Sequence, residues 1–374
     1  MLYFDNSATS GYKPINVLDN TINVIKYLST NAGRSGHRLS KTASDMIFNA
    51  RKKISAFFNN QSIEKVIFTK NCTEALNMAI YGTISQGDNV ITSVFEHNSV
   101  LRPLFTLRDK GVITLTIISP KNNQFINGED IKNAFTPKTK VVVINHISNV
   151  NGSINDIDSI GEFLKDKDTT FIVDGAQSGG HLKIDMQKSN VDILCLAGHK
   201  GLYAIQGSGI LVLNKNIDIN SFMQGGTGTE TFNTTQPDCY PEKLEAGTLN
   251  LPSICSLYEG VCYVENNLNY ISTSLMNLTK FLIENLQKLQ NITIYSKPNI
   301  AGIVAFSMKN VNSIELAEIL STKYDIASRG GFHCAPFMHK FLKTEESGLL
   351  RISLSPANTI NELVQLLSAL KQLI

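Results

Sequence analysis

The sequence has almost no excess charge, since its 34 Lys and Arg residues balance 32 Asp and Glu residues to a net charge of +2. This near-neutrality gives no electrostatic case for nucleic acid or an anionic membrane as the main partner. No run approaches the roughly 18 apolar residues of a membrane span, and the N-terminal residues reach Asp5 too early for a signal peptide. We therefore expect a soluble, cytoplasmic protein whose partners are small molecules or proteins.

The cysteines lack the paired spacing of a zinc ribbon or a disulfide framework. All six are scattered along a long chain without a CxxC pair: Cys72, Cys195, Cys239, Cys255, Cys262 and Cys334. This spacing suggests no metal site, and most of these residues are expected to be small buried hydrophobes.

The length of 374 residues predicts two or three folding units, or one large unit with a smaller partner. Hydrophobic residues make up 42% of the chain, which is typical of a globular protein and excludes disorder. Internal repeats, low-complexity tracts and long linkers are not seen, so we expect the units to pack tightly.

Seven short, β-branched runs with little internal alternation are typical of strands buried on both faces. They are 65–69, 89–93, 113–118, 141–144, 171–174, 193–196 and 209–213. Helix-compatible segments between them, such as 72–85 and 159–165, give the βαβ rhythm of a mostly parallel sheet covered by helices. The sequence therefore predicts an α/β domain, which we place at residues 15–250.

The C-terminal third has a different pattern of predicted helices and strands. Helices are predicted at 253–266, 273–289, 313–323 and 359–373, with short strands at 292–295, 302–308 and 350–354. This pattern predicts a smaller α+β domain of residues 1–14 and 251–374, closing on the first.

A lysine and an aspartate follow two of the predicted strands. Lys200 lies in a glycine-rich turn just after the strand 193–196, and Asp174 ends the strand 171–174. Ligands of α/β proteins bind at such strand ends. The pair suits pyridoxal phosphate, because the lysine forms a Schiff base and the carboxylate keeps the pyridinium nitrogen protonated. Alone, each residue is more simply a surface lysine or a helix-capping aspartate.

Two further strand ends supply polar groups. After 65–69, Asn71 and Glu74 fit a capping box, so helix-start amides and the Thr73 hydroxyl would face an anion. His97 follows the strand 89–93, where an imidazole can stack on a pyridine ring. An ordinary capped helix and a solvated histidine are the simpler alternatives.

Cys334 lies in a glycine-containing loop, preceded by His333 and five residues after Arg329. Its surroundings suggest a reactive thiol, with cationic or polar neighbours favouring the thiolate and glycines letting the loop approach a substrate. A buried packing role is the alternative, which the flanking glycines and proline disfavour. Arg329 and Arg351 offer guanidinium forks for a carboxylate.

At this point the chain resembles a known family: the class V, fold-type I pyridoxal-phosphate enzymes, in particular cysteine desulfurases of the second, SUF-like group and selenocysteine lyases. The resemblance runs essentially from end to end. It is carried by the segments 3–8, 33–37, 71–77, 96–98, 146–152, 174–177, 198–200, 225–228, 245–248 and 329–334, and by Arg351.

The resemblance implies roles residue by residue. Lys200 would be the Schiff-base lysine, Asp174 the pyridinium partner, His97 the ring-stacking group and Gln177 a donor to the phenolic oxygen. The phosphate would be held by Thr73, His199 and, from a second subunit, Thr248. Asn149 and Arg351 resemble the substrate-carboxylate pair, with Arg329 nearby, and Arg34 and His37 match a segment that reaches the partner's site. A homodimer with shared active sites is implied.

Four positions depart from the family pattern. Ala197 and Cys72 stand where relatives commonly have groups that contact the phosphate, although Cys72 keeps its place among the expected cofactor-binding residues. Losing one or two such hydrogen bonds would weaken cofactor binding by about tenfold or more unless backbone amides compensate. Leu249 and Phe332 also differ from common residues and bear on the substrate.

The resemblance predicts a cysteine desulfurase that converts L-cysteine to L-alanine and leaves a persulfide on Cys334, for transfer to a sulfur-acceptor protein. The alternatives are a selenocysteine lyase acting on L-selenocysteine, and another class V enzyme that catalyses transamination or β-elimination. A non-catalytic scaffold is disfavoured, because a scaffold needs no matched set of lysine, carboxylate and thiol.

Overall fold

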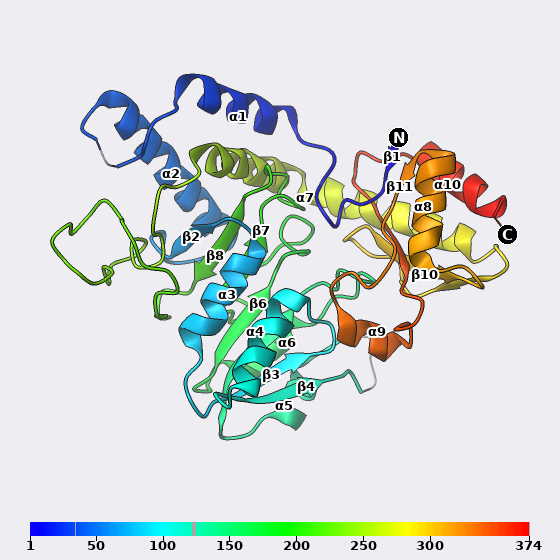
Figure 1. Ribbon diagram of the computed structural model, residues 1–374, viewed down its shortest axis with the longest axis horizontal. Helices are drawn as coiled ribbons and strands as arrows, with labels where there is room; N and C mark the ends of the chain where they lie inside the picture. Colours follow the sequence, from blue (N-terminus) through cyan, green and yellow to red (C-terminus); the bar gives the residue numbers. More distant parts are fainter. Residues whose placement is uncertain (34, 122–124, 374) are drawn as a thin grey trace.

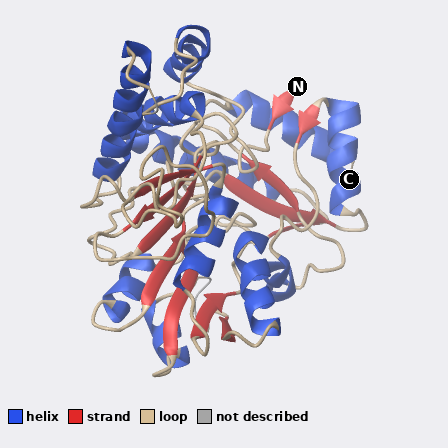
Figure 2. Cartoon of the chain, turned by 60° about the vertical axis from the view of Figure 1, so that its left-hand side comes forward, coloured by secondary structure: helices blue, strands red, loops and turns tan. Residues whose placement is uncertain are grey.

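The structure, a computed structural model, describes residues 1–33, 35–121 and 125–373. A large sheet lies at its centre (Figures 1 and 2), and it has seven strands. Across the sheet the order is β2 (Val66–Thr69), β8 (Gly209–Leu213), β7 (Ile193–Ala197), β6 (Thr170–Asp174), β5 (Thr139–Asn145), β3 (Asn89–Ser93) and β4 (Thr114–Ile118). Among these strands β8 alone runs antiparallel to its neighbours. The predicted seven-stranded, mostly parallel sheet is confirmed.

Both faces of this sheet are buried, which explains why its strands show no alternation of polar and apolar residues. In β5, Val141 and Val143 contribute to the core that contains α3 (Cys72–Thr83), whereas Val142 and Ile144 contribute to the core that contains α7 (Leu251–Leu286). Successive side chains of one strand thus enter two different cores.

The remaining elements surround the sheet and build the C-terminal part (Figure 1). The other helices are α1 (Ile15–Tyr27), α2 (Arg38–Phe57), α4 (Asn98–Asp109), α5 (Gly128–Ala134), α6 (Ile157–Leu164), α8 (Ser313–Tyr324), α9 (Pro336–Leu342) and α10 (Ile360–Lys371). A second, antiparallel sheet has the order β12 (Leu350–Ser353), β10 (Ile303–Met308) and β9 (Ile292–Ile294).

The prediction of two helices at 253–266 and 273–289 is wrong, because α7 runs without interruption through both. The intervening asparagines do not break the helix, since the Asn267 side chain donates to the carbonyl of Tyr263 at 2.8 Å inside it. Ile271 and Leu275 are fully buried beyond this stretch. Packing of these apolar side chains outweighs the weak helix propensity of the polar stretch.

The N-terminus is joined to the C-terminal part of the chain. Strand β1 (Leu2–Tyr3) pairs in parallel with β11 (Ile326–Ala327), and Asp5 forms a bridge with Ser353 of β12. This pairing supports grouping residues 1–14 with the C-terminal residues, although the division into two domains stays a prediction. In the part of the chain described, the helices are too short or too polar to cross a membrane.

Candidate active site

The carboxyl ends of β3, β5, β6 and β7 meet at one edge of the large sheet and form the wall of a pocket. Eight of the residues predicted to bind the cofactor line this pocket: Cys72, Thr73, His97, Asn149, Asp174, Gln177, His199 and Lys200. Strand order therefore gathers residues that are up to 128 positions apart, from Cys72 to Lys200.

Asp174 is the last residue of β6 and is 2% exposed. Its Oδ1 accepts a hydrogen bond from the backbone N–H of Ala176 at 2.9 Å, and the Cys72 thiol donates to the same oxygen at 3.6 Å. Burial raises the pKa of Cys72 well above its ordinary value, so this thiol keeps its proton and can donate it. Both identified donors engage Oδ1, so Oδ2 is available for a cationic ligand.

Lys200 follows β7 and faces the same pocket as Asp174. Burial lowers its pKa, and the positive charges of Arg351 and Arg329 lower it further, while Asp174 acts in the opposite direction. A lysine with a lowered pKa holds more neutral amine, the form that acts as a nucleophile and as a base.

His97 caps α4 through its ring. The backbone N–H of Ser99 donates to Nδ1 at 3.1 Å, and the Ser99 hydroxyl lies 2.8 Å from the same nitrogen. Because a backbone N–H can only donate, Nδ1 carries no proton and the neutral ring has its proton on Nε2. Burial lowers the pKa of His97 to about 4, so the imidazole is neutral at physiological pH.

The start of α3 supplies the amides expected to face an anion. Asn71 caps the helix by accepting from the N–H of Glu74 at 2.9 Å, as predicted. Glu74 accepts from the N–H of Lys70 rather than from that of Asn71, so the predicted capping box is wrong in this half. Thr73 contacts the Ser99 hydroxyl at 2.8 Å, which places both hydroxyls at this end of the pocket.

Cys334 is exposed and lies on the loop between β11 and α9. Its φ of 58° and that of His333, 49°, are in the left-handed region that non-glycine residues rarely adopt. Two contacts hold this backbone against the start of α4 and the turn after β5: Asn98 N–H donates to the Cys334 carbonyl at 2.7 Å, and Asn149 Nδ2 donates to the His333 carbonyl at 2.7 Å. The loop is therefore held beside His97 and Asn149, which follow β3 and β5.

His333 is one of the neighbours expected to be cationic or polar. Its ring is a neutral neighbour of Cys334, because its Nε2 donates to the Leu349 carbonyl at 3.1 Å and burial lowers its pKa to about 2. The glycines of the loop also have a local structural requirement, while their role in motion stays a prediction. A Cβ at Gly330 would lie 2.1 Å from the Ser313 carbonyl, and Gly331 has a φ of 106°.

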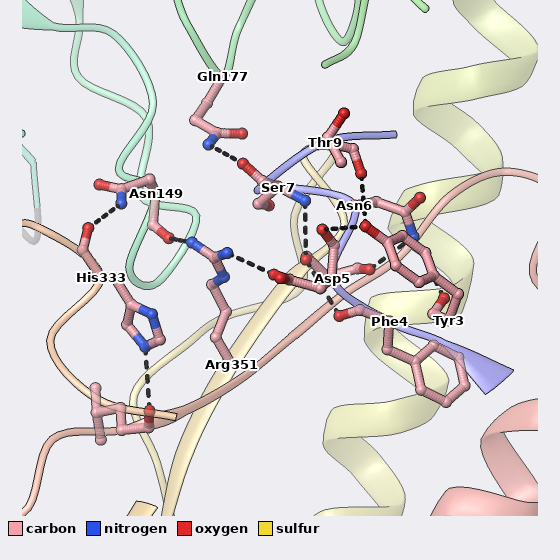
Figure 3. A network of polar contacts seen from close by, with 12 residues as sticks. Tyr3, Phe4, Asp5, Asn6, Ser7, Thr9, Asn149, Gln177, His333 and Arg351 are labelled. Carbon is pink, nitrogen blue, oxygen red and sulfur yellow. Dashed lines mark hydrogen bonds and ion pairs between the residues drawn. The ribbon is translucent and has the colours of Figure 1, made fainter. Parts of the chain in front are cut away.

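Arg351 lies on β12, and its backbone is hydrogen-bonded to that of Arg329. Its side chain is 1% exposed, with Nη1 donating to the Asn149 carbonyl at 2.9 Å and Nη2 pairing with Asp5 at 2.8 Å (Figure 3). The predicted pair of Asn149 and Arg351 is thus in direct contact, with Arg329 opposite Arg351 in an isolated bridge just after β11.

Comparison with known proteins places this arrangement in a family. The sequence profile of the family aminotransferase class-V matches residues 2–366. The chain belongs to the class-V aminotransferases. A probable cysteine desulfurase of Pyrococcus abyssi is 31% identical over 100% of this chain and 94% of its own length. A probable cysteine desulfurase of Staphylococcus aureus is 32% identical, with 100% and 92% covered.

Solved structures agree with this assignment. The apo structure of a cysteine desulfurase from Thermococcus onnurineus has a TM-score of 0.89 and 28% identity, covering 100% of this chain and 94% of the other. A cysteine desulfurase from Escherichia coli, at 24% identity and a TM-score of 0.88, covers 99% and 94% and shows the likeness of fold. The predicted fold-type I architecture is confirmed.

Class-V enzymes use pyridoxal phosphate, and polar side chains are part of the lining of this pocket. Gln177 Oε1, His199 Nδ1 and Asn149 Oδ1 are buried and have no hydrogen-bond partner among the residues that the structure describes. Orphaned polar atoms beside Asp174 and Lys200 fit a polar ligand that would satisfy them. Gln177 Nε2 already donates one hydrogen bond, to the Ser7 carbonyl at 3.0 Å.

Thr248 and His37 do not line this pocket within one chain, and neither do the substrate-binding candidates Arg329 and Arg351 or the Cys334 side chain. Thr248 is exposed and lines a different cavity, with Phe68 and Ser253. His37 is exposed and caps α2, accepting from Ser40 N–H at 3.1 Å. Arg34 lies outside the described residues. Their predicted role in a partner's site stays a prediction.

Ser99 and Asn145 also line the pocket and were missed. Ser99 stands two residues after His97 at a helix start, where a hydroxyl commonly meets the capping group, so its position was readable. Asn145 is the last residue of β5 and pairs with Asp174 in register, which only the strand order reveals. No group of three or more potential metal ligands occurs in the described ranges.

Proposed function

We propose that the protein is a pyridoxal-phosphate-dependent cysteine desulfurase, in which L-cysteine and the Cys334 thiol give L-alanine and a persulfide on Cys334. The observation that carries the proposal is the tether at 2.7 Å between the Cys334 carbonyl and Asn98 N–H. It holds the backbone of an exposed cysteine next to the residue that follows His97, which lines the pocket of Lys200 and Asp174. The curated relatives named as probable cysteine desulfurases support the same reaction.

The proposed cofactor contacts follow the shape of the pocket. Lys200 would hold the cofactor covalently, and Asp174 Oδ2 would accept from its protonated ring nitrogen. His97 would lie against the ring, and Gln177 would donate to the phenolic oxygen through the second N–H of Nε2, since the first already bonds the Ser7 carbonyl. When bound, the cofactor supplies an electron sink next to the substrate Cα.

The phosphate end would use Thr73, His199 and the amides at the start of α3, where Cys72 is the first helical residue. The thiol of Cys72 faces Asp174, so its contribution here is its backbone N–H. Backbone amides would thereby compensate for the hydroxyl that the family commonly has at this position.

Lys200 is the proposed proton carrier. Once released by the substrate amine, its neutral Nζ takes the proton from the substrate Cα. The lowered pKa favours this neutral form, and Asp174 lies in the same pocket to balance the positive charge that results.

Cys334 is the proposed acceptor of sulfur. Its thiolate attacks the substrate sulfur and forms the S–S bond, while the Cβ–S bond breaks and leaves its electron pair on the carbon side. Protonation of that carbon gives the methyl group of alanine. One sulfur atom moves from cysteine to Cys334, and the oxidation states balance without an external oxidant.

The substrate carboxylate would bind Arg351 and Asn149, with Arg329 nearby, because guanidinium forks pair with carboxylates through charge-assisted hydrogen bonds. The proposal also includes a homodimer in which Thr248, His37 and Arg34 complete the partner's site. A sulfur-acceptor protein, the two-domain division and the cytoplasmic location expected from the sequence belong to the same proposal.

The test is alanine release from L-cysteine by cofactor-loaded protein with a reductant present. Cys334→Ser is expected to lose this activity and retain the cofactor, whereas Cys239→Ser, which alters the other exposed cysteine, is expected to keep it. Full alanine release by the Cys334 variant would contradict the assigned role.

The relative rates on L-selenocysteine and L-cysteine distinguish a selenocysteine lyase from a cysteine desulfurase. Dependence on Cys334 for the sulfur substrate only, with faster turnover of the selenium substrate, would favour the lyase. Amino transfer to an α-keto acid would instead indicate transamination.

A further inference from the structure

The guanidinium of Arg351 already has a carboxylate partner inside the protein. Asp5 Oδ1 accepts from Nη2 at 2.8 Å, across 346 residues of sequence (Figure 3). The other identified bond joins Nη1 to the Asn149 carbonyl at 2.9 Å. Nε is buried and has no partner in the part of the chain that the structure describes.

The unused Nε points to a ligand. In a guanidinium, Nε and one Nη share an edge that a carboxylate can grip with two parallel hydrogen bonds. Asp5 supplies a single bond, to Nη2. A substrate carboxylate that accepts hydrogen bonds from both Nε and Nη2 therefore competes with Asp5, which already accepts from Nη2.

The backbone around Asp5 is fixed on both sides. Ser353 N–H donates to the Phe4 carbonyl at 2.7 Å, and Asn6 N–H donates to the Ser353 carbonyl at 3.2 Å. These bonds run along β12, the strand that carries Arg351. The Asp5 main chain cannot withdraw without breaking them, so the carboxylate stays within reach of Arg351 whether or not a substrate is present.

We propose that Asp5 is an internal carboxylate that competes with the substrate carboxylate for Arg351 and so sets the affinity of the site for amino acids. The inference rests on the proposed function, in which Arg351 binds the substrate carboxylate. Asp5 acts through Arg351 and is an affinity-setting residue rather than a catalytic one.

Charge repulsion and the stability of the unliganded ion pair both make substrate binding weaker when Asp5 is present. A second carboxylate at one guanidinium is repelled by the first, so the charge of Asp5 weakens substrate binding. The free site also gains from the existing pair, because a buried guanidinium without a counter-charge is costly. Removing the charge of Asp5 therefore destabilises the free protein and tightens carboxylate binding, whereas the native residue favours release of alanine.

The experiment uses the cofactor-loaded protein and propionate, a carboxylate that has no amine and cannot react with the cofactor. Asp5→Asn keeps the size of the side chain and removes its charge. We expect the propionate dissociation constant from calorimetry to fall by about threefold to tenfold, with a lower midpoint of thermal unfolding. An unchanged or larger dissociation constant in folded Asp5→Asn protein would overturn the proposal.

Two further variants separate charge from packing. Asp5→Glu keeps the charge, and we expect propionate affinity near that of the unaltered protein. If the Glu variant binds propionate as tightly as the Asn variant, packing and not charge is responsible and the proposal fails. Asp325→Asn is the matched control, because it removes an exposed carboxylate that pairs with the N-terminal amine next to β1. It should leave propionate binding unchanged.

The result is independent of the proposed desulfuration. Absence of alanine from L-cysteine would reject the reaction but leave the propionate measurement valid. Loss of propionate binding in Arg351→Lys is expected in the native and Asp5→Asn backgrounds alike. Undiminished binding there would show that Arg351 is not the carboxylate site and would overturn the role of Asp5.

Discussion

The two halves of the site are built in different ways. Asp174, Lys200 and His97 follow strands of one sheet, in a pocket whose walls are set by strand order and register. Cys334 is exposed on a loop in left-handed backbone geometry, joined to the sheet by single hydrogen bonds from Asn98 and Asn149. In the proposed function, the sheet edge pre-organises groups that must stay fixed, and the loop presents the thiol that would meet both substrate and sulfur acceptor.

The largest effect on activity is expected from a substitution at the sheet edge. Lys200→Ala removes the amine that would hold the cofactor and carry the Cα proton, so alanine release should fall by about 1,000-fold or more. The measurement is alanine production, together with protein mass after borohydride reduction. The unaltered protein should gain the mass of the reduced cofactor, and the variant should not. An equal mass gain in both proteins would remove Lys200 from this role.

An intermediate effect is expected from a substitution that disrupts the packing of the Cys334 loop. Gly330→Ala places a Cβ against the Ser313 carbonyl, a backbone atom that cannot turn aside. We expect the free energy of unfolding to fall by about 1–3 kcal/mol, because overpacking at a fixed contact is destabilising. Denaturant unfolding checks this value.

The matched control for the loop is Gly36→Ala, since a Cβ at Gly36 would meet no atom of the described residues within 4 Å. Equal stability of the two variants would show that Gly330 is retained for another reason. If Gly330→Ala protein keeps its full cofactor content, the packing of the loop is not required for cofactor binding at the sheet edge.

The smallest expected effect concerns a buried carboxyl at the sheet edge. Glu96 Oε1 accepts from Ser93 Oγ at 2.5 Å and Asn145 N–H at 2.9 Å, and burial raises its pKa from 4.5 to about 8. The unfolded chain then releases this proton at lower pH than the folded chain. The contribution of Glu96 to stability is complete below about pH 4.5 and is lost as the pH rises through about 8.

Glu96→Gln tests this sign. From about pH 5 to about pH 8, the free energy of unfolding of the unaltered protein should fall relative to the Gln variant, by about 1 kcal/mol or more. Urea unfolding at the two pH values measures the difference. Glu129→Gln, at an exposed position of α5, should show no such trend, and a parallel response of Glu96→Gln and unaltered protein would refute the raised pKa.

Sequence patterns predicted the sheet edge better than the loop. Lys200, Asp174 and His97 directly follow apolar runs, and strand ends of a parallel sheet converge, so their proximity was predictable from the chain. Asp5 and Arg351 were not linked, because their contact depends on the pairing of N-terminal residues with β12.

Other differences have local causes. The glycines near Cys334 suggested flexibility, whereas Gly330 lies against the backbone of Ser313. His333, one of the neighbours expected to be cationic or polar, is a neutral ring because burial lowers its pKa, and its Nε2 donates inward to the Leu349 carbonyl. Sequence shows which residues are adjacent in the chain, and side-chain direction needs the packed structure.

The most direct test of the account is the mass of the peptide that contains Cys334 after L-cysteine is added to cofactor-loaded protein without a reductant. The account predicts that this peptide gains the mass of one sulfur atom, with an equal amount of alanine released, and that Lys200→Ala protein shows neither. Alanine release with the added sulfur on another cysteine, or on none, would contradict it.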